Sequence, residues 1–345
     1  MYSETDLEAA VAAGVITPAA AEAFRNHVAA GRATPIVDEE SFRLLTGFND
    51  IFVSIALVLL LVALGWIGGE RSAALAGALV AGASWGLAEY FTRRRRMALP
   101  SILLLLSFTG GVAATMIGAL VDIQADFGDR TSALFLAGIG VITAAAAWGH
   151  WLRFRVPITV AAGAVSLVGV VVALALAINQ NLVDHVTWLV LAGGLATFAF
   201  AMWWDMSDRT RQTRRSDVAF WLHLAAAPMI AHPIFHALGV LDGTIGTAQA
   251  AIVIALYIIF AMISLTVDRR ALLVSSLAYV LYAMSALFEK FGAVSMSVAL
   301  TGLVIGSALL TLSAFWHTAR RLVVNTLPGD LRAKLPVLDK PAISA

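Results

Sequence analysis

Ten apolar stretches run through this sequence and are separated by short polar loops. Each stretch is close to the ~20 residues that an α-helix needs to cross the ~30 Å hydrocarbon core of a membrane. A backbone inside a bilayer must satisfy its own hydrogen bonds, so single stretches of this length predict helices rather than strands. The predicted spans are 50–69, 72–91, 98–121, 131–151, 157–178, 186–204, 218–238, 248–267, 271–288 and 296–316.

Arginine clusters occupy every second loop between these stretches. Cytoplasmic loops retain Lys and Arg, so the alternation predicts the direction of each span. It predicts an all-α integral membrane protein with about ten transmembrane helices arranged as five hairpins and both termini in the cytoplasm. The clusters lie at 93–96, 153–155, 209–215, 269–270 and 320–321, and only Arg71, Arg130 and Lys290 fall in the intervening loops.

Composition supports a membrane protein and excludes several other classes. Hydrophobic residues make up 60% of the chain and charged residues 13%, against ~45–50% and ~25% in soluble domains. The net charge is only +1, and the uneven placement of basic residues is explained by topology, so no nucleic-acid partner is expected. The excess of Arg over Lys and the abundance of Ala favour a bacterial source, which predicts the inner membrane.

Catalytic and cofactor signatures are missing from the sequence. It has no cysteine, which excludes a disulfide, a thiolate metal site and a thiol nucleophile. It also lacks a Walker motif, a Gly-x-Ser-x-Gly elbow, a His-Glu-x-x-His helix and a dinucleotide fingerprint. We therefore expect no enzyme activity and no cofactor.

The N-terminal residues 1–37 are predicted to form a cytoplasmic helical hairpin and a linker. Ser3–Asp6 matches a capping box, Gly14 can end the first helix, and Thr17-Pro18 supplies the cap and first residue of the second. Beyond this hairpin we predict an amphipathic lead-in helix at 38–49, the transmembrane domain at 50–316 and an amphipathic cytoplasmic tail at 317–345.

The seventh span carries most of the chemistry that lies inside the predicted membrane. It contains His223, His232 and His236 together with Pro228 and Pro233. Each proline removes a backbone donor, so the span is predicted to be kinked or discontinuous, a feature of binding regions in many transporters. These five residues are our candidates for a substrate pathway.

Two other interpretations of the same histidines remain open. His232 and His236 are four residues apart, so they share a helix face and could supply half of a zinc or haem site. Alternatively, the histidines hydrogen-bond to carbonyls that the prolines leave unpaired.

Small residues at helical spacing indicate close helix packing, either within the chain or between copies in a homo-oligomer. The clearest pairs are Gly82-x-x-x-Gly86 and Gly302-x-x-x-Gly306. The expected partners are therefore the lipid bilayer, a second copy of the chain, and a cytoplasmic partner that binds through residues 3–30.

The stretch Leu7–Phe24, with Gly14–Pro18 and Ala21, resembles a broad group of bacterial predicted membrane proteins that carry a domain-of-unknown-function label. The resemblance implies a small cytoplasmic helical hairpin followed by a multi-spanning region, and it implies no established activity. Gly65-Trp66 stands where that group would lead us to expect Asn-Trp.

Three functional hypotheses follow from the sequence. The first is a transporter or facilitator for a small solute, with the seventh span lining the path. The second is a non-catalytic membrane scaffold or sensor that makes contacts through its N-terminal hairpin. The third is a metal- or haem-binding membrane protein that uses His232 and His236.

Overall fold

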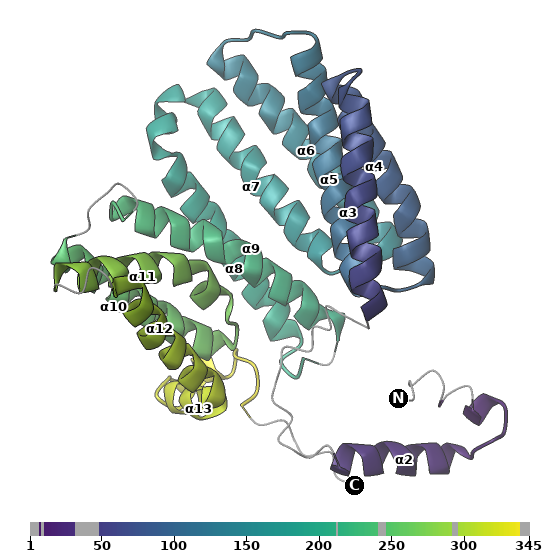
Figure 1. Cartoon of the computed structure of the whole chain (residues 1–345), viewed down its shortest axis with the longest axis vertical. Coiled ribbons are helices and arrows are strands. Elements are labelled where there is room, and N and C mark those ends of the chain that lie inside the picture. Colours follow the sequence, from purple (N-terminus) through teal and green to yellow (C-terminus); the bar gives the residue numbers. More distant parts are fainter. Residues whose placement is uncertain are drawn as a thin grey trace. The chain divides into compact units, whose positions relative to one another are not determined.

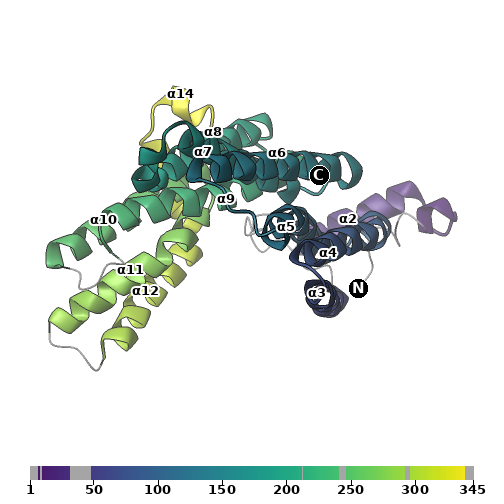
Figure 2. The same cartoon turned by 90° about the horizontal axis from the view of Figure 1, so that it is seen from above.

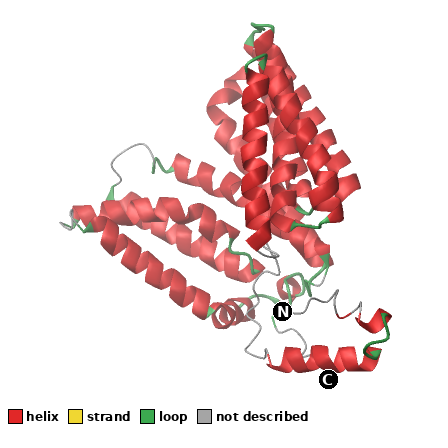
Figure 3. Ribbon diagram, turned by 45° about the vertical axis from the view of Figure 1, so that its right-hand side comes forward, coloured by secondary structure: helices red, strands yellow, loops and turns green. Residues whose placement is uncertain are grey.

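A computed structural model describes residue 7 and residues 10–31, 48–211, 213–240, 246–291 and 296–338. Within these residues the chain is helical and has no strands (Figure 3). Nine of the helices described there are long and apolar enough to cross a membrane, which confirms the predicted class of a multi-pass helical membrane protein. The predicted capping box at 3–6 and most of the lead-in helix, 38–47, lie outside the described residues.

The elements follow the apolar pattern of the sequence closely. They are α2 (Pro18–Gly31), α3 (Phe48–Gly69), α4 (Ala73–Ala88), the π-helix η1 (Glu89–Arg94), α5 (Ala98–Asp122), α6 (Asp129–Phe154), α7 (Ile158–Ile178), the 3₁₀ segment η2 (Gln180–His185), α8 (Val186–Ser207), α9 (Arg214–Ala237), α10 (Thr247–Val267), α11 (Ala271–Lys290), α12 (Ser297–Ala314), α13 (Trp316–Asn325) and α14 (Gly329–Arg332).

The predicted span 72–91 differs from the other nine. It corresponds to α4, which has only 16 residues and continues directly into the six-residue η1. Ser72 caps the start of α4 by accepting a hydrogen bond from the Leu75 amide at 3.1 Å. Because the end of the apolar run is wound as a π-helix, α4 alone is shorter than a typical transmembrane helix.

The helix pairs that pack most extensively are α4 with α5, α6 with α7, α8 with α9, and α10 with α11 (Figure 1). Each of these pairs is joined by one of the basic loops. The five hairpins predicted from sequence pair the helices across the other loops, where packing is weaker. Packing therefore groups the helices differently from the predicted hairpins. Both views place α3, α4 and α5 together, and α10, α11 and α12 together (Figures 1 and 2).

Glycines bring α4 and α5 into close contact. A Cβ atom added at Gly111 would lie 2.8 Å from the backbone nitrogen of Ala81, and one added at Gly77 or Gly118 would overlap the partner backbone. Small residues of this kind let two helices approach where lipid provides no hydrophobic driving force.

Asp122 connects α5 to the first turn of α4 through hydrogen bonds. It is the last residue of α5, and its two carboxylate oxygens accept hydrogen bonds from the amides of Ala73 and Ala74 at 2.8 and 3.0 Å. These amides are unpaired donors in the first turn of α4, so Asp122 caps a neighbouring helix.

The glycine pairs singled out from the sequence do not lie at a contact between helices. A Cβ atom added at Gly82, Gly86, Gly302 or Gly306 would have no heavy atom within 4 Å. Neither pair therefore contributes to helix packing within the described part of the chain.

The chain divides into two compact units, Met1–Arg43 with Asp339–Ala345, and Leu44–Leu338. In the first unit, Gly14 adopts φ +70° and ends the helical turn before it, as predicted. The Thr17 hydroxyl accepts a hydrogen bond from the Ala20 amide at 3.1 Å, which confirms the predicted cap of α2.

Candidate functional site

Helix α9, the predicted seventh span, is more buried than any other candidate span among the described residues. It contacts α7, α8 and α11 and so connects two groups of helices. The histidines and prolines predicted from sequence all lie on this helix, and their surroundings differ from one another.

His223 lies on a buried face of α9 directed at α8. Its Nε2 is 2.9 Å from Oδ2 of Asp205, a distance at which the Nε2–H donates to the carboxylate. His232 is exposed, and its Nδ1 lies 2.6 Å from the hydroxyl of Tyr279 on α11. His236 is also exposed, and its ring is 6.0 Å from that of His232.

The two prolines lie within one continuous helix, so of the two predicted forms, kinked or discontinuous, the discontinuous one is wrong. Pro233 is buried and Pro228 exposed within one helix from Arg214 to Ala237. Pro233 cannot donate to the carbonyl of Met229, and α8 approaches this turn through Gly194. A Cβ atom added at Gly194 would lie 2.8 Å from Met229 Cβ and 3.0 Å from the Met229 carbonyl oxygen.

A metal site is not assembled around His232 and His236. No group of three or more His, Cys, Asp or Glu side chains in the described part of the chain could hold a metal ion. Tyr279 is the hydrogen-bond partner of His232, and its ring stacks on Phe235 with the centroids 4.5 Å apart.

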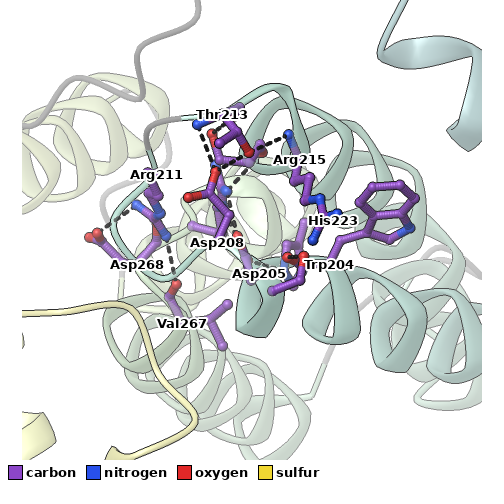
Figure 4. Close-up of polar contacts among 12 residues, drawn as sticks. Trp204, Asp205, Asp208, Arg211, Thr213, Arg215, His223, Val267 and Asp268 are labelled. Carbon is purple, nitrogen blue, oxygen red and sulfur yellow. Dashed lines mark hydrogen bonds and ion pairs between the residues drawn. The ribbon is translucent and has the colours of Figure 1, made fainter.

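A charge cluster is buried where α8, α9 and α13 meet the loop between α10 and α11, and Figure 4 shows its members Asp205, Arg211, His223 and Asp268. At its centre, Asp205 lies between His223 and Arg269. The Arg269 guanidinium donates to Asp205 Oδ1 at 2.7 Å and to the Ser216 carbonyl at 3.0 Å. Both of these side-chain neighbours donate to the carboxylate, which compensates for removing its charge from water.

Asp268, in the loop between α10 and α11, forms the second centre of the cluster. Its Oδ2 accepts from Arg211 at 2.7 Å, and its Oδ1 accepts from the Trp316 indole at 2.7 Å and lies 3.6 Å from Arg320 Nε. Burial alone would raise the pKa of Asp268, but the charges of Arg211 and Arg320 and the Trp316 bond outweigh it and hold the pKa below its ordinary value.

The C-terminal segment is bound to the same cluster through arginines. Arg209 Nε donates to the Leu335 carbonyl at 2.8 Å, and the Arg320 guanidinium donates to the carbonyls of Pro336 and Val337 at 2.7 and 3.1 Å. The Val337 amide in turn donates to the Arg209 carbonyl. These bonds hold the backbone of the segment, and the side chain of Leu335 is buried as well.

A small hollow lies beside the charge cluster. It measures about 10 Å³, about the size of one water molecule, and is lined by residues that include His223, Arg269 and Phe198. This hollow is too small for a solute, and the cluster can position helices and hold charge.

Open space lies between α5, α6, α7, α8 and α9. Two adjoining hollows of about 550 and 450 Å³ share lining residues, and together we call them the apolar groove. Helix α9 contributes Trp221, Leu224, Ala225 and Met229 to its walls, whereas His223, His232 and His236 do not line it. The shared residues are Ala113, Thr143, Val165 and Ser166.

The few hydroxyl groups in the apolar groove already donate hydrogen bonds to backbone carbonyls. Thr109, Thr143 and Ser166 donate to the carbonyls of Leu105, Ile139 and Ala162, four residues back on their own helices, at 2.8–3.0 Å. A hydrophilic solute would therefore find few polar partners, while an apolar chain would find contact along the whole groove.

A further buried histidine was not singled out from sequence. His150 on α6 is enclosed by Trp85, Phe108 and Phe154, with ring centroids 4.5–5.9 Å away, and its Nδ1 is 3.4 Å from the Thr159 hydroxyl. Its Nε2 is buried without a partner among the described residues. This cluster of rings around His150 packs α4, α5, α6 and α7 together.

Apart from His223, the residues of the charge cluster were also missed, because the arginines in alternate loops were interpreted as orientation signals. One signal was available, since Asp268 directly precedes Arg269-Arg270 within a basic loop. No sequence rule pairs Asp205 with Arg269, which lie 64 positions apart.

No protein-family model matches the chain, and no curated protein or solved structure shows significant similarity to it. The resemblance of the N-terminal stretch to a group of bacterial membrane proteins thus stays a prediction. The fold and the nine apolar helices found in the described ranges define the class, a multi-pass helical membrane protein.

Proposed function

We propose that the protein is a facilitator for an apolar or amphiphilic small molecule, with α9 lining the path through the apolar groove. The observation that carries this proposal is the groove itself, whose wall combines residues of five helices and whose hydroxyls are bonded to backbone. The expected location is the bacterial inner membrane, with ten spans and both termini in the cytoplasm.

The proposal keeps the predicted role of the seventh span and changes the residues that perform it. Trp221, Leu224, Ala225 and Met229 face the groove and would contact the transported molecule. His223 belongs to the charge cluster and would hold α9 in position. Pro228, Pro233, His232 and His236 are not needed to contact the molecule.

Two glycines allow a direct test. Gly110 and Gly169 line the groove, and a Cβ atom added at either has no heavy atom within 4 Å. Leucine at both positions would therefore fill the groove without displacing the backbone. Gly138 on α6 has equally open surroundings but does not line the groove, so Gly138→Leu is the matched control.

The experiment follows a fluorescent lysophospholipid analogue across the membrane of proteoliposomes, using a membrane-impermeant quencher. Liposomes with the wild-type chain should translocate the analogue faster than protein-free liposomes. The Gly110→Leu/Gly169→Leu variant should lose this acceleration and Gly138→Leu should keep it. Equal rates in wild-type and protein-free liposomes, or in both variants, would count against the proposal.

A membrane scaffold or sensor is the second candidate, and one observation favours it. Residues Met1–Arg43 belong to a compact unit of their own, and Val15 and Phe24 are exposed there at 75% and 45%. Deletion of residues 1–37 should then abolish crosslinked complexes in membranes while the transmembrane helices remain folded by circular dichroism. Unchanged complexes after the deletion would remove this candidate.

A further inference from the structure

A second pocket lies between α10, α11, α12 and α13, away from the apolar groove. It has a volume of about 180 Å³, below the ~300–1,000 Å³ of sites that enclose a drug-sized molecule. A pocket of this size accommodates part of one extended chain. Its lining includes Tyr257, Arg270, Leu273, Leu277, Leu312 and Trp316.

The pocket has one charged end and apolar walls. Arg270 is the residue before α11, and Leu273, Val274 and Leu277 follow it at positions that share a helix face. At 1.5 Å per residue, the step from Arg270 to Leu277 covers roughly 10 Å along the axis of α11. A guanidinium therefore lies at the start of an apolar slot.

Arg270 differs from the arginines around it. Arg211 and Arg269 are bound to carboxylates, and Arg320 is bound to backbone carbonyls beside Asp268. The guanidinium of Arg270 lies over the ring of Trp316 at 4.7 Å and has no carboxylate partner among the described residues. Trp316 is itself fixed by its bond to Asp268, so Arg270 is a positioned cation whose N–H groups are available.

Tyr257 also lines the pocket. Its hydroxyl is buried and has no hydrogen-bond partner among the described residues. Its aromatic ring therefore contributes apolar surface to the pocket wall.

We propose that this pocket binds an anionic membrane phospholipid, with its phosphate on Arg270 and one acyl chain along Leu273 and Leu277. A guanidinium offers phosphate a planar pair of donors, and basic pockets between transmembrane helices recognise anionic headgroups in this way. The site is separate from the apolar groove and does not depend on the proposed transport function.

The test titrates the purified full-length chain with dioctanoyl-phosphatidylglycerol and counts bound lipid by native mass spectrometry. Arg270→Gln should weaken binding by about tenfold, the loss expected for one charge-assisted contact. Arg94→Gln is the matched control, because Arg94 is an exposed arginine of another basic cluster and lines neither this pocket nor the apolar groove. This control should bind like the wild type.

Three further arms test whether the bound molecule is an anionic lipid. Leu312→Trp fills the slot while keeping Arg270, and it should weaken binding as well. Dioctanoyl-phosphatidylcholine has the same phosphate but a choline cation that offsets its charge, so it should bind the wild type more weakly and should lose less affinity on Arg270→Gln. Inorganic phosphate should not displace the lipid. Displacement by phosphate, equal binding of both lipids, or wild-type binding by a folded Arg270→Gln chain would overturn the proposal.

Discussion

Asp205 is only 1% exposed, and both His223 and Arg269 donate to its carboxylate. The Asp205→Asn variant would leave the guanidinium of Arg269 buried without a counter-charge. Breaking a buried pair in this way costs about 3–5 kcal/mol. We therefore expect a marked fall in the thermal unfolding temperature of the detergent-solubilised protein.

The matched control for this prediction is Glu89→Gln. Glu89 also accepts from an arginine, Arg153, at 2.7 Å, but its side chain is 33% exposed and water can replace the partner. Its unfolding temperature should stay near that of the wild type. If both variants lost the same stability, burial would not be what makes the Asp205 pair important.

Asp268 predicts a dependence of stability on pH. Its pKa is lower in the folded chain than its ordinary value of 3.8, so the carboxylate form stabilises the fold. This stabilisation is fully present above about pH 5 and is lost as the pH falls through the folded pKa. Thermal unfolding followed from pH 7 to pH 3 should show a smaller acid-induced loss for Asp268→Asn than for the wild type. An identical pH profile would contradict this assignment.

The sequence predicted how close single residues lie to the membrane interface, but it did not predict which residues contact one another. Asp205 and Arg269 were both expected near a membrane interface, and both lie near the ends of the helices that the apolar pattern predicts. Their contact depends on how α8 and α9 pack against the loop before α11, and an apolar pattern contains no information on that packing. His223 was recognised as unusual for a membrane segment, yet its partner Asp205 was not.

At the scale of helices, glycine contacts make a sharp prediction for α4 and α5. Gly111→Ala would bring a Cβ atom to 2.8 Å from the Ala81 backbone, a distance that requires one helix to shift. Overpacking of this kind costs about 1–3 kcal/mol. Gly82→Ala has open space and gains helix propensity, so it should be neutral or slightly stabilising.

These two variants can be compared by thermal unfolding in the same detergent, because both replace a glycine within a helix by the same residue. A lower unfolding temperature for Gly111→Ala alone is the expected result. Equal temperatures would show that α4 and α5 are packed less closely than these glycine contacts indicate.

The apolar runs predicted nine helices of the described ranges correctly because length and hydropathy suffice to recognise a span. They did not predict that 89–94 would form a π-helix, since the residues there are mostly polar and the difference depends on the register of backbone hydrogen bonds. Glycine spacing likewise identified a face on α4 and another on α12, but neither face meets a neighbouring helix within the described residues. The glycines through which α4 and α5 contact each other, at 77, 111 and 118, do not form a Gly-x-x-x-Gly pair.

At the scale of the whole molecule, the hairpin grouping shows where sequence and packing diverge. The basic loops predict the side of the membrane on which each helix begins, and this is a statement about insertion. Packing depends instead on small residues and loop bonds, and it joins the helices across those same basic loops. The predicted direction of insertion and the observed packing are compatible, because the direction of a helix does not specify which neighbour it contacts most.

The number of spans can be tested with single cysteines, because the chain contains no cysteine of its own. If α4 and η1 cross the membrane together, Arg71→Cys and Arg94→Cys lie on opposite faces. A membrane-impermeant maleimide applied to intact spheroplasts should then label Arg71→Cys, Arg130→Cys and Lys290→Cys. Arg94→Cys and Arg214→Cys should be labelled only after lysis, because the basic loops are predicted to face the cytoplasm. Labelling of Arg94→Cys in intact spheroplasts would mean that α4 and η1 do not cross the membrane. The N-terminus and the later basic loops would then lie on different sides of it.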